Sequence, residues 1–430
     1  MAGPDMPAAK TLLTYLAPAA FLAGMAHLAW LAGAHWTSSA DDFRLLWLAG
    51  DFWTAGGNPY TEEFAQTAAA QFAGIENALW LAGPNWFPIA AIFSLFDPAT
   101  AGRAWFFFNA AALLGASGLN VATFRKMAAQ STLFGDTEFA SLLKSLSPLT
   151  LFLLHAGFIT TTEAVSGAFV LGAASPLVYF GASLLLYGAA AKHDLAGAGG
   201  VALLMLQPSI GLILIAGLGL SAYGRRALIL GAIFSFLMAV PVLAVTPGVD
   251  IAAALISGAG QTPSGSAEAA AGLRALLSAA GAPDLGAMFY FLLALAAVST
   301  AGLAGRKRAR ALKPVDNLMI AASAALAVAP LHAPNFVLVG VLLFYAAALR
   351  PPLGAGLIAA AFLSWRGGDL PGFGLVDASV YASLGATAMF ALLIGAGFFS
   401  PAPAPVRRPA PSLGDNVVLW SAFIKKRRNA

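Results

Sequence analysis

Long apolar runs, separated by short polar stretches, recur along the chain from Thr11 to Phe399. Because a transmembrane helix needs about 20 consecutive apolar residues, runs of this kind predict helices that cross a lipid bilayer. Several runs are too short for a straight lipid-facing span. The predicted helices cover 11–34, 103–124, 141–158, 163–190, 195–207, 208–223, 228–246, 286–304, 316–331, 335–349, 352–365 and 379–399.

Two prolines shape this pattern. Pro208 separates 195–207 from 208–223, which predicts a hairpin of two short helices. Pro176 lies inside 163–190 and predicts a kink in one continuous helix. The run 11–34 is longer than the apolar core of a signal peptide and has no clear cleavage site after it, so we expect it to anchor the chain.

The composition agrees with a chain solvated mainly by lipid. Of the 430 residues, 59% are hydrophobic and 10% are charged, against roughly 25% charged in a soluble domain. The absence of cysteine excludes disulfides, thiolate nucleophiles and Cys-ligated metals. Five scattered histidines show no metal-ligand spacing, and we expect no metal. The sequence therefore predicts an all-α polytopic membrane protein.

The basic residues fall almost entirely on one side of the predicted helices. All 23 Lys and Arg residues except four lie on the side shared by both termini. By the positive-inside rule this side is cytoplasmic. We expect a multi-pass protein of the inner (plasma) membrane with an acidic periplasmic or extracellular face. The four outer arginines are Arg44, Arg103, Arg274 and Arg366.

Residues 1–400 form the predicted membrane domain, with two long outer loops at 35–102 and 247–285. The first loop opens with an amphipathic stretch, which predicts a helix on the membrane surface that ends at Gly56-Gly57. The second is rich in Gly, Ser and Ala, and it is either a lid over a site or a plain connector. Residues 401–430 form a Pro-rich, basic cytoplasmic tail whose charge favours anionic lipid over nucleic acid.

The first outer loop carries a family resemblance. D-F-R-L-L-W-L-A-G-D-F-W-T-A-G-G-N-P-Y (42–60), N-W-F-P-I-A-A-I-F-S-L-F-D-P (85–98) and A-W-F-F-F-N (104–109) resemble the amino-terminal signature of glycosyltransferase family 87. The order and spacing of later elements agree with the resemblance along nearly the whole chain. These are L-L-H-A-G-F (153–158), at the position of a family turn, L-Q-P-S-I-G-L (206–212), similar to K-P-Q-x-G-L, and A-P-L-H-A-P-N-F (329–336), similar to S-P-x-x-x-H-Y.

The resemblance implies a GT-C type bundle of about 12 transmembrane helices with interfacial helices in the large first outer loop. It implies an inverting hexosyltransferase that takes a sugar, usually mannose, from a polyprenyl-phosphate donor and passes it to a hydroxyl of a lipid or glycan. The donor carries one phosphate rather than a diphosphate, so we expect no bridging metal and no cofactor. The partners are the donor, the acceptor and membrane lipids, with no nucleic acid.

The transfer requires a base for the acceptor hydroxyl, and an ionised carboxylate in a partly dry site performs this role. The resemblance implies that Asp42 is this base, and a helix cap is the alternative role for Asp42. Asp41 is its adjacent rival, as a supporting group or a cap. Asp51 lies half a helical turn away and is expected to be solvated.

Positive charge or hydrogen-bond donors must meet the phosphate of the leaving lipid. Each arginine could instead lie at the membrane interface with its charged end in water, and His332 could simply pack in its turn. Gln207 stands where the family usually has a lysine. The candidates for donor phosphate or support are His332, Arg44, Arg103, Arg366 and Gln207.

Sugar and acceptor contacts call for amide, carboxylate and aromatic side chains near the same face. Aromatic residues also gather at this depth in any membrane protein, which is the competing explanation for Tyr60 and Trp86. Glu163, after three threonines, is explained equally well by the start of a helix. The candidate contacts are Asp41, Tyr60, Asn85, Trp86 and Asn335.

Three other functions stay open. A transporter or flippase of a lipid-linked saccharide would favour charges midway along spans and two repeated halves, and neither is clear in this chain. A GT-C transferase for arabinose, galacturonic acid or glucose would share the architecture. A structural or assembly protein without chemistry would also have a similar sequence.

Overall fold

The computed structural model describes residues 6–35, 41–72, 75, 80, 82–127, 138–219, 224–253, 270–271, 273–281, 283, 285–307, 314–329 and 331–348. All of them belong to the first of two units into which the chain divides, Met1–Gly397. The predicted helices 352–365 and 379–399 and the tail 401–430 lie outside the described residues, as does Arg366.

The regular secondary structure of the described chain is helical apart from one pair of two-residue strands. Its first half contains α1 (Met6–His35), α2 (Asp41–Thr54), α3 (Glu62–Gln71), η1 (Pro84–Trp86), α4 (Phe87–Ser94), α5 (Pro98–Met127), α6 (Glu138–Ser145), α7 (Pro148–Thr160), α8 (Glu163–Leu171) and α9 (Ser175–Ala191). Its second half contains α10 (Asp194–Leu204), α11 (Pro208–Gly219), α12 (Gly224–Leu243), β1 (Ala270–Ala271), α14 (Leu273–Ala279), α15 (Ala287–Lys307), α16 (Pro314–Val328), β2 (Leu331–His332), η3 (Ala333–Leu338) and α17 (Val339–Ala348).

Three of the described helices, α1, α5 and α12, are long and apolar enough to cross a membrane. The pair α7 and α8, bent by 63°, forms a fourth candidate if it is taken as one broken span. Shorter apolar helices, among them α9, α10 and α11, pack with these long ones. The architecture is therefore a bundle of apolar helices compatible with a membrane protein.

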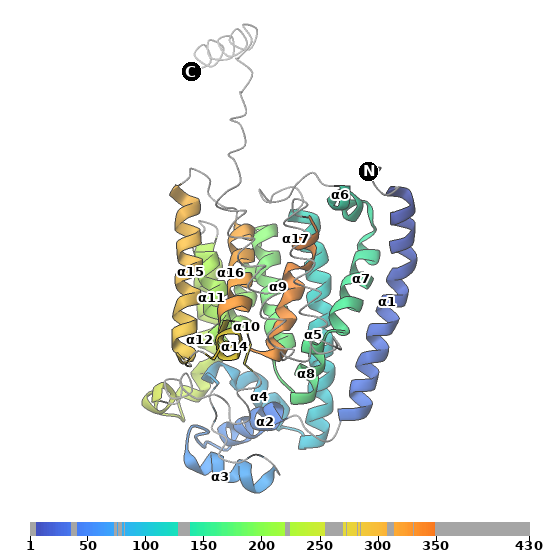
Figure 1. Ribbon diagram of the computed structural model, residues 1–430. Coiled ribbons are helices and arrows are strands. Elements are labelled where there is room, and N and C mark those ends of the chain that lie inside the picture. The colour runs from blue at the N-terminus through green and yellow to red at the C-terminus, as the bar shows by residue number, and fades with distance from the viewer. Residues whose placement is uncertain are drawn as a thin grey trace, which may run out of the picture. The chain divides into compact units, whose positions relative to one another are not determined.

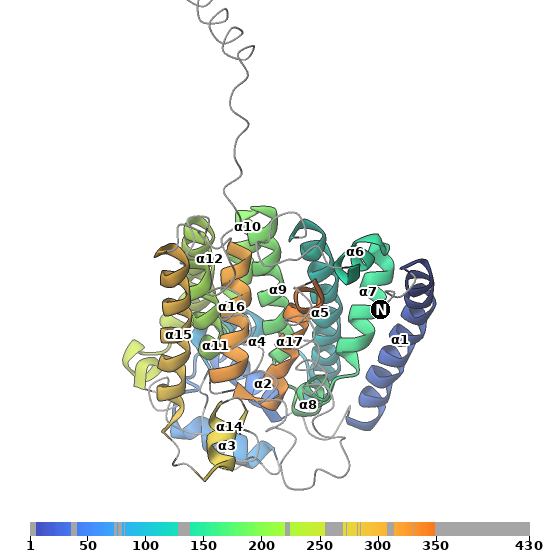
Figure 2. The ribbon, with the colours of Figure 1, turned by 45° about the horizontal axis from the view of Figure 1, so that its top comes forward.

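The bundle helices lie side by side and α2, α3 and α4 gather at one end (Figure 1). The long helices of the bundle still lie side by side after a 45° rotation (Figure 2). Helix α9 packs against both α5 and α10, while α1 packs mainly against α7. The segment predicted as the first outer loop thus forms a helical layer at one end of the bundle.

Several predicted elements are confirmed. The runs 11–34, 103–124 and 228–246 correspond to α1, α5 and α12, each extended or shifted by a few residues. The short hairpin is also confirmed, because α10 ends at Leu204 and Pro208 begins α11.

The single kinked helix predicted for 163–190 is wrong. Helix α8 ends at Leu171, and Gly172 caps it with φ of 66°, a left-handed conformation that glycine adopts without strain. Helix α9 starts anew at Ser175, with Pro176 in its first turn. A backbone N–H has no helical partner there, so proline loses no hydrogen bond. Pro176 therefore starts a helix and does not kink one.

The turn that the resemblance places at 153–158 is also wrong, and the single helix predicted over 141–158 is divided into α6 and α7. Residues 153–158 lie inside α7, and the chain turns later, at Thr161 and Thr162, before α8 begins. Gly157 allows α1 to approach closely, since a Cβ on it would lie 2.5 Å from the Ala20 carbonyl carbon. His155 is fully buried and bonds the Gly340 carbonyl oxygen through Nε2 at 2.9 Å.

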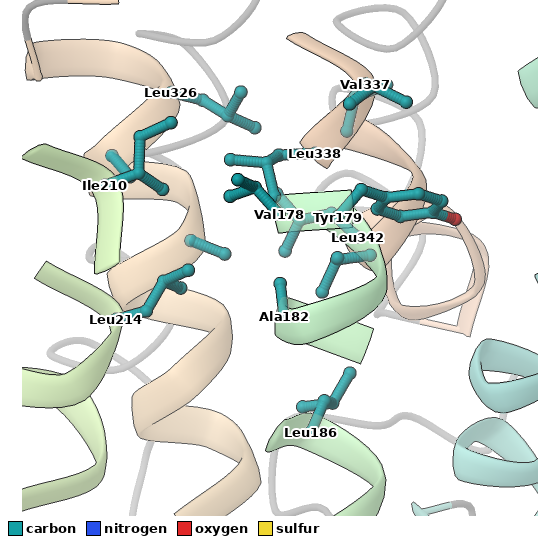
Figure 3. Close-up of a cluster of buried hydrophobic side chains, with 14 of the residues drawn as sticks. Val178, Tyr179, Ala182, Leu186, Ile210, Leu214, Leu326, Val337, Leu338 and Leu342 are labelled. Carbon is teal, nitrogen blue, oxygen red and sulfur yellow. The ribbon is translucent and has the colours of Figure 1, made fainter. Parts of the chain in front are cut away.

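The main apolar core joins α9, α11, α16, η3 and α17 (Figure 3). Tyr179 on α9 points away from its aliphatic neighbours, and its hydroxyl accepts a hydrogen bond from Asn120 Nδ2 at 2.8 Å. Asn120 Nδ2 also donates to Ser183 Oγ at 3.1 Å. In a membrane-embedded core such paired polar groups fix which helix faces meet.

We expect Gly157→Ala to destabilise the protein by about 1–3 kcal/mol, because the added methyl group meets the backbone of α1. Gly118→Ala on α5 is the control, since a Cβ there has no atom within 4 Å, and it should leave stability unchanged or slightly raised. Thermal unfolding of both variants in detergent micelles measures the difference. Equal midpoints for the two variants would contradict the close α1–α7 contact.

Candidate functional site

The two segments predicted as outer loops contact one another. Asn58 Nδ2, in the turn after α2, donates to Asp250 Oδ2 at 2.9 Å. Ala270 in β1 pairs antiparallel with His332 in β2. Residues of both loops and of the 329–336 element are therefore assembled in one region of the structure.

Helix α2 presents two adjacent carboxylates at its start. Asp41 and Asp42 lie in its first turn, where the helix dipole favours negative charge. The buried face of α2, which includes Phe43 and Leu46, packs on α4 and α5. Asp51 is exposed on the same helix, as predicted.

Asp42 is exposed to solvent and, within the described residues, makes no hydrogen bond. Its role is therefore not that of a side-chain cap. Desolvation by the surrounding protein, followed by repulsion from Asp41, raises the pKa of Asp42 to about 6. The side chain is thus accessible, while the surrounding protein disfavours its charged form. At neutral pH it is mainly ionised and able to accept a proton.

Arg44 is held by its neighbours and does not bond Asp42. Arg44 Nη1 lies 3.1 Å from Asp41 Oδ1, one helical turn away. Its guanidinium also lies 5.7 Å from the centre of the Phe72 ring. Asp41 is therefore a partner of Arg44, and Asp42 has no counter-ion among the residues that the structure describes.

A chain of aromatic rings leads from α2 toward the bundle. Phe43, next to Asp42, stacks on Trp105 with ring centres 5.5 Å apart. Trp105 in turn lies 6.5 Å from Trp86. Both indoles donate to backbone carbonyls at 2.8 Å, Trp105 to Gly172 and Trp86 to Leu206. These two bonds fix the turns that follow α8 and α10 relative to α2.

Those two turns carry a polar network. Asn335 Oδ1 in η3 accepts a hydrogen bond from Ser175 Oγ at 2.9 Å and one from Gln207 Nε2 at 3.3 Å. Ser175 follows Gly172 closely in the chain, and Gln207 follows Leu206 directly. The structure thus brings the predicted residues Gln207 and Asn335 together and adds Ser175, which the sequence prediction missed. Nothing local to A-A-S-P marks Ser175, because its partner is 160 residues away.

The aromatic and amide candidates near η1 are largely enclosed. Tyr60 donates from its hydroxyl to the Ala82 carbonyl at 2.8 Å, and burial raises the pKa of Tyr60 above its usual range. Asn85 is buried and lies 3.4 Å from Ser235 Oγ. Trp86 is buried as well. Each has a visible packing role, and the sugar contacts predicted for them stay predictions.

The remaining candidates are placed less directly. Arg103 is exposed near the start of α5. His332 is described through its backbone, as the residue of β2 that pairs with Ala270. Glu163 is exposed in the first turn of α8, which Thr162 caps through its side chain. No three His, Cys, Asp or Glu side chains converge within the described ranges in a way that could hold a metal ion.

The chain matches no protein-family model, and no curated protein is significantly similar to it in sequence.

We expect Asp42→Asn to raise thermal stability at pH 8 more than at pH 4. Folding raises the Asp42 pKa from 3.8 to about 6, so the folded state loses stability as pH rises between these values and does not regain it above them. The asparagine variant avoids this loss. Unfolding midpoints of the purified protein across this pH range test the expectation.

Asp51→Asn is the matched control, because Asp51 lies exposed on the same helix. A stabilisation that is equal at pH 4 and pH 8 for Asp42→Asn, or equal for the two variants at pH 8, would contradict the desolvated setting of Asp42.

Proposed function

We propose that the protein is an integral membrane glycosyltransferase of the GT-C type, similar to glycosyltransferase family 87. It transfers a hexose, most often mannose in that family, from a polyprenyl-phosphate donor to a hydroxyl of a lipid or glycan. The observation that carries the proposal is Asp42, an accessible carboxylate with no hydrogen-bond partner among the described residues and a pKa of about 6. A general base works best with a pKa near the operating pH.

In the proposed reaction these groups have the following roles. The ionised Asp42 carboxylate takes the proton of the acceptor hydroxyl as its oxygen bonds to the anomeric carbon of the donor sugar. The bond between that carbon and the phosphate oxygen breaks, and polyprenyl phosphate leaves with the electron pair. The direct displacement inverts the anomeric configuration, and the amides of Gln207 and Asn335 supply neutral hydrogen-bond donors on the same assembly.

The surroundings of Asp42 also support a lipid-linked donor. Helices α2, α3 and α4 lie at one end of a bundle of apolar helices, where a substrate could keep its chain in lipid and its head at the carboxylate (Figure 1). In the proposed topology the bundle has about 12 spans, both termini are cytoplasmic, and Asp42 faces the periplasm or cell exterior. Charged residues of α1, α5 and α12 lie near the helix ends, which favours transfer over midplane ion-coupled transport.

We expect Asp42→Asn to reduce sugar transfer by about 10²–10⁴-fold, the usual contribution of a positioned base. The measurement is radiolabelled sugar transfer from synthetic polyprenyl-phosphate-mannose to a lipid extract by the purified protein. Asp51→Asn should retain activity, and EDTA should not abolish it. A folded Asp42→Asn protein with the wild-type rate would overturn the assignment of the base.

The same transfer assay also tests donors that carry other sugars. If mannose is not transferred, a panel of prenyl-phosphate sugars identifies the donor. Failure with the whole panel, together with movement of the lipid-linked saccharide across vesicles, would favour the transporter.

The pH dependence gives a second expectation. The value of kcat/KM for sugar transfer, which reports the titration of the free enzyme, should fall below a pH of about 6 as Asp42 becomes protonated. Asp41→Asn removes the repulsion that helps to raise this pKa, so the acidic limb should move to lower pH. An unmoved limb in Asp41→Asn would show that another group controls it.

A further inference from the structure

Three distant segments converge on the side-chain amide of Asn335. Ser175 is the first residue of α9, Gln207 lies between α10 and α11, and Asn335 lies in η3. Ser175 and Asn335 are each only 4% exposed. Both Ser175 Oγ and Gln207 Nε2 donate to the same atom, Asn335 Oδ1. The carbonyl end of this amide is therefore fully engaged.

The hydroxyl of Ser175 has no local purpose. A serine at a helix start usually accepts a bond from a backbone N–H of its own first turn. Here Ala174 is the N-cap residue, and its carbonyl accepts from the N–H groups of Leu177 and Val178. The Ser175 hydroxyl instead donates across the structure to Asn335. Its role is therefore tertiary.

The occupied carbonyl fixes the direction of the amide nitrogen. Because Oδ1 faces Ser175 and Gln207, Asn335 Nδ2 faces away from both, and it makes no hydrogen bond with any described residue. The nitrogen itself is not sealed off, so its N–H groups stay open to an acceptor oxygen, and pairing with one is favourable in so enclosed a residue. Phe336, Val337 and Leu338, which follow it, are buried and hold the backbone of η3 in the core. Val337 and Leu338 lie among the core side chains in Figure 3.

We infer that Ser175 is a positioning residue that turns the Asn335 amide so that its N–H groups donate to an oxygen of the polyprenyl-phosphate-linked sugar. The inference rests on the proposed function and deepens it. Phosphate oxygens and sugar hydroxyls share the required acceptor chemistry. Gln207 acts with Ser175 as the second donor that fixes the same amide.

The experiment is a double-mutant cycle on the full-length protein. Ser175→Ala should raise the donor KM about fivefold, the size of one neutral hydrogen bond, and change kcat less than twofold. In the Asn335→Ala background, Ser175→Ala should add less than twofold, because its partner is gone. An undiminished effect in that background would overturn the positioning role.

Ser183→Ala is the matched control. Ser183 is a fully buried serine of the same helix, and its hydroxyl donates to the Tyr179 carbonyl at 2.9 Å, within the bundle core. Its loss should lower thermal stability without raising the donor KM. A KM increase equal to that of Ser175→Ala would show that any lost hydroxyl in α9 has the same effect, and would overturn the inference.

Equilibrium binding separates this inference from the proposed function. The dissociation constants of polyprenyl-phosphate-mannose and of polyprenyl phosphate alone are measured for wild type and the same variants. If wild type binds the donor without transferring sugar, the proposed function fails, and the binding cycle alone supports or overturns the role of Ser175. Weaker binding of both ligands in Ser175→Ala indicates a phosphate contact, and weaker binding of the donor alone indicates a sugar contact. If wild type binds neither ligand, both proposals fail.

Discussion

Two indole N–H groups contribute to the contact between the bundle and the layer formed by α2, α3 and α4. Trp105 and Trp86 each donate to a backbone carbonyl at 2.8 Å, at Gly172 and Leu206, and Trp105 also stacks on Phe43 of α2. The indole N–H is the only hydrogen-bond donor of a Trp side chain. When a buried Trp donates it to a backbone carbonyl, the bond orients the ring and holds that carbonyl's turn against it. Asp42 and the Asn335 network therefore belong to one assembly, although no hydrogen bond within the described chain joins them.

The apolar surroundings explain why the bundle can use broken and short helices. Backbone groups in lipid must be bonded within the protein, and breaks are tolerated only where protein covers them. The break between α7 and α8 meets this condition, because His27 Nδ1 of α1 bonds the Thr160 carbonyl oxygen at 2.7 Å and His27 Nε2 lies 3.1 Å from Ser166 Oγ. Gly157 lets α1 come close enough for this contact. Small residues and polar bonds thus act together at one helix pair.

The sequence was informative where the signal is local. Apolar length predicts α1 and α5, and Pro208 marks the start of α11, because each signal lies within the element it describes. It was misleading at Gly172, whose left-handed cap ends α8 inside an apolar run that looks continuous. The adjacent pair of carboxylates at the start of α2 was identified, but Ser175 was not, since its meaning depends on a partner in a distant segment.

Helical spacing also decides which of the two carboxylates is free. Arg44 lies three residues after Asp41, so these two side chains share a helix face. Arg44 lies only two residues after Asp42, so its side chain and that of Asp42 point to different faces. The cation therefore balances Asp41 and leaves Asp42 to be raised in pKa by its desolvated setting and by Asp41 itself. Such a carboxylate lowers the stability of the fold, a cost that functional sites often carry, and Asp42 has no partner among the described residues; for these reasons we propose it as the base.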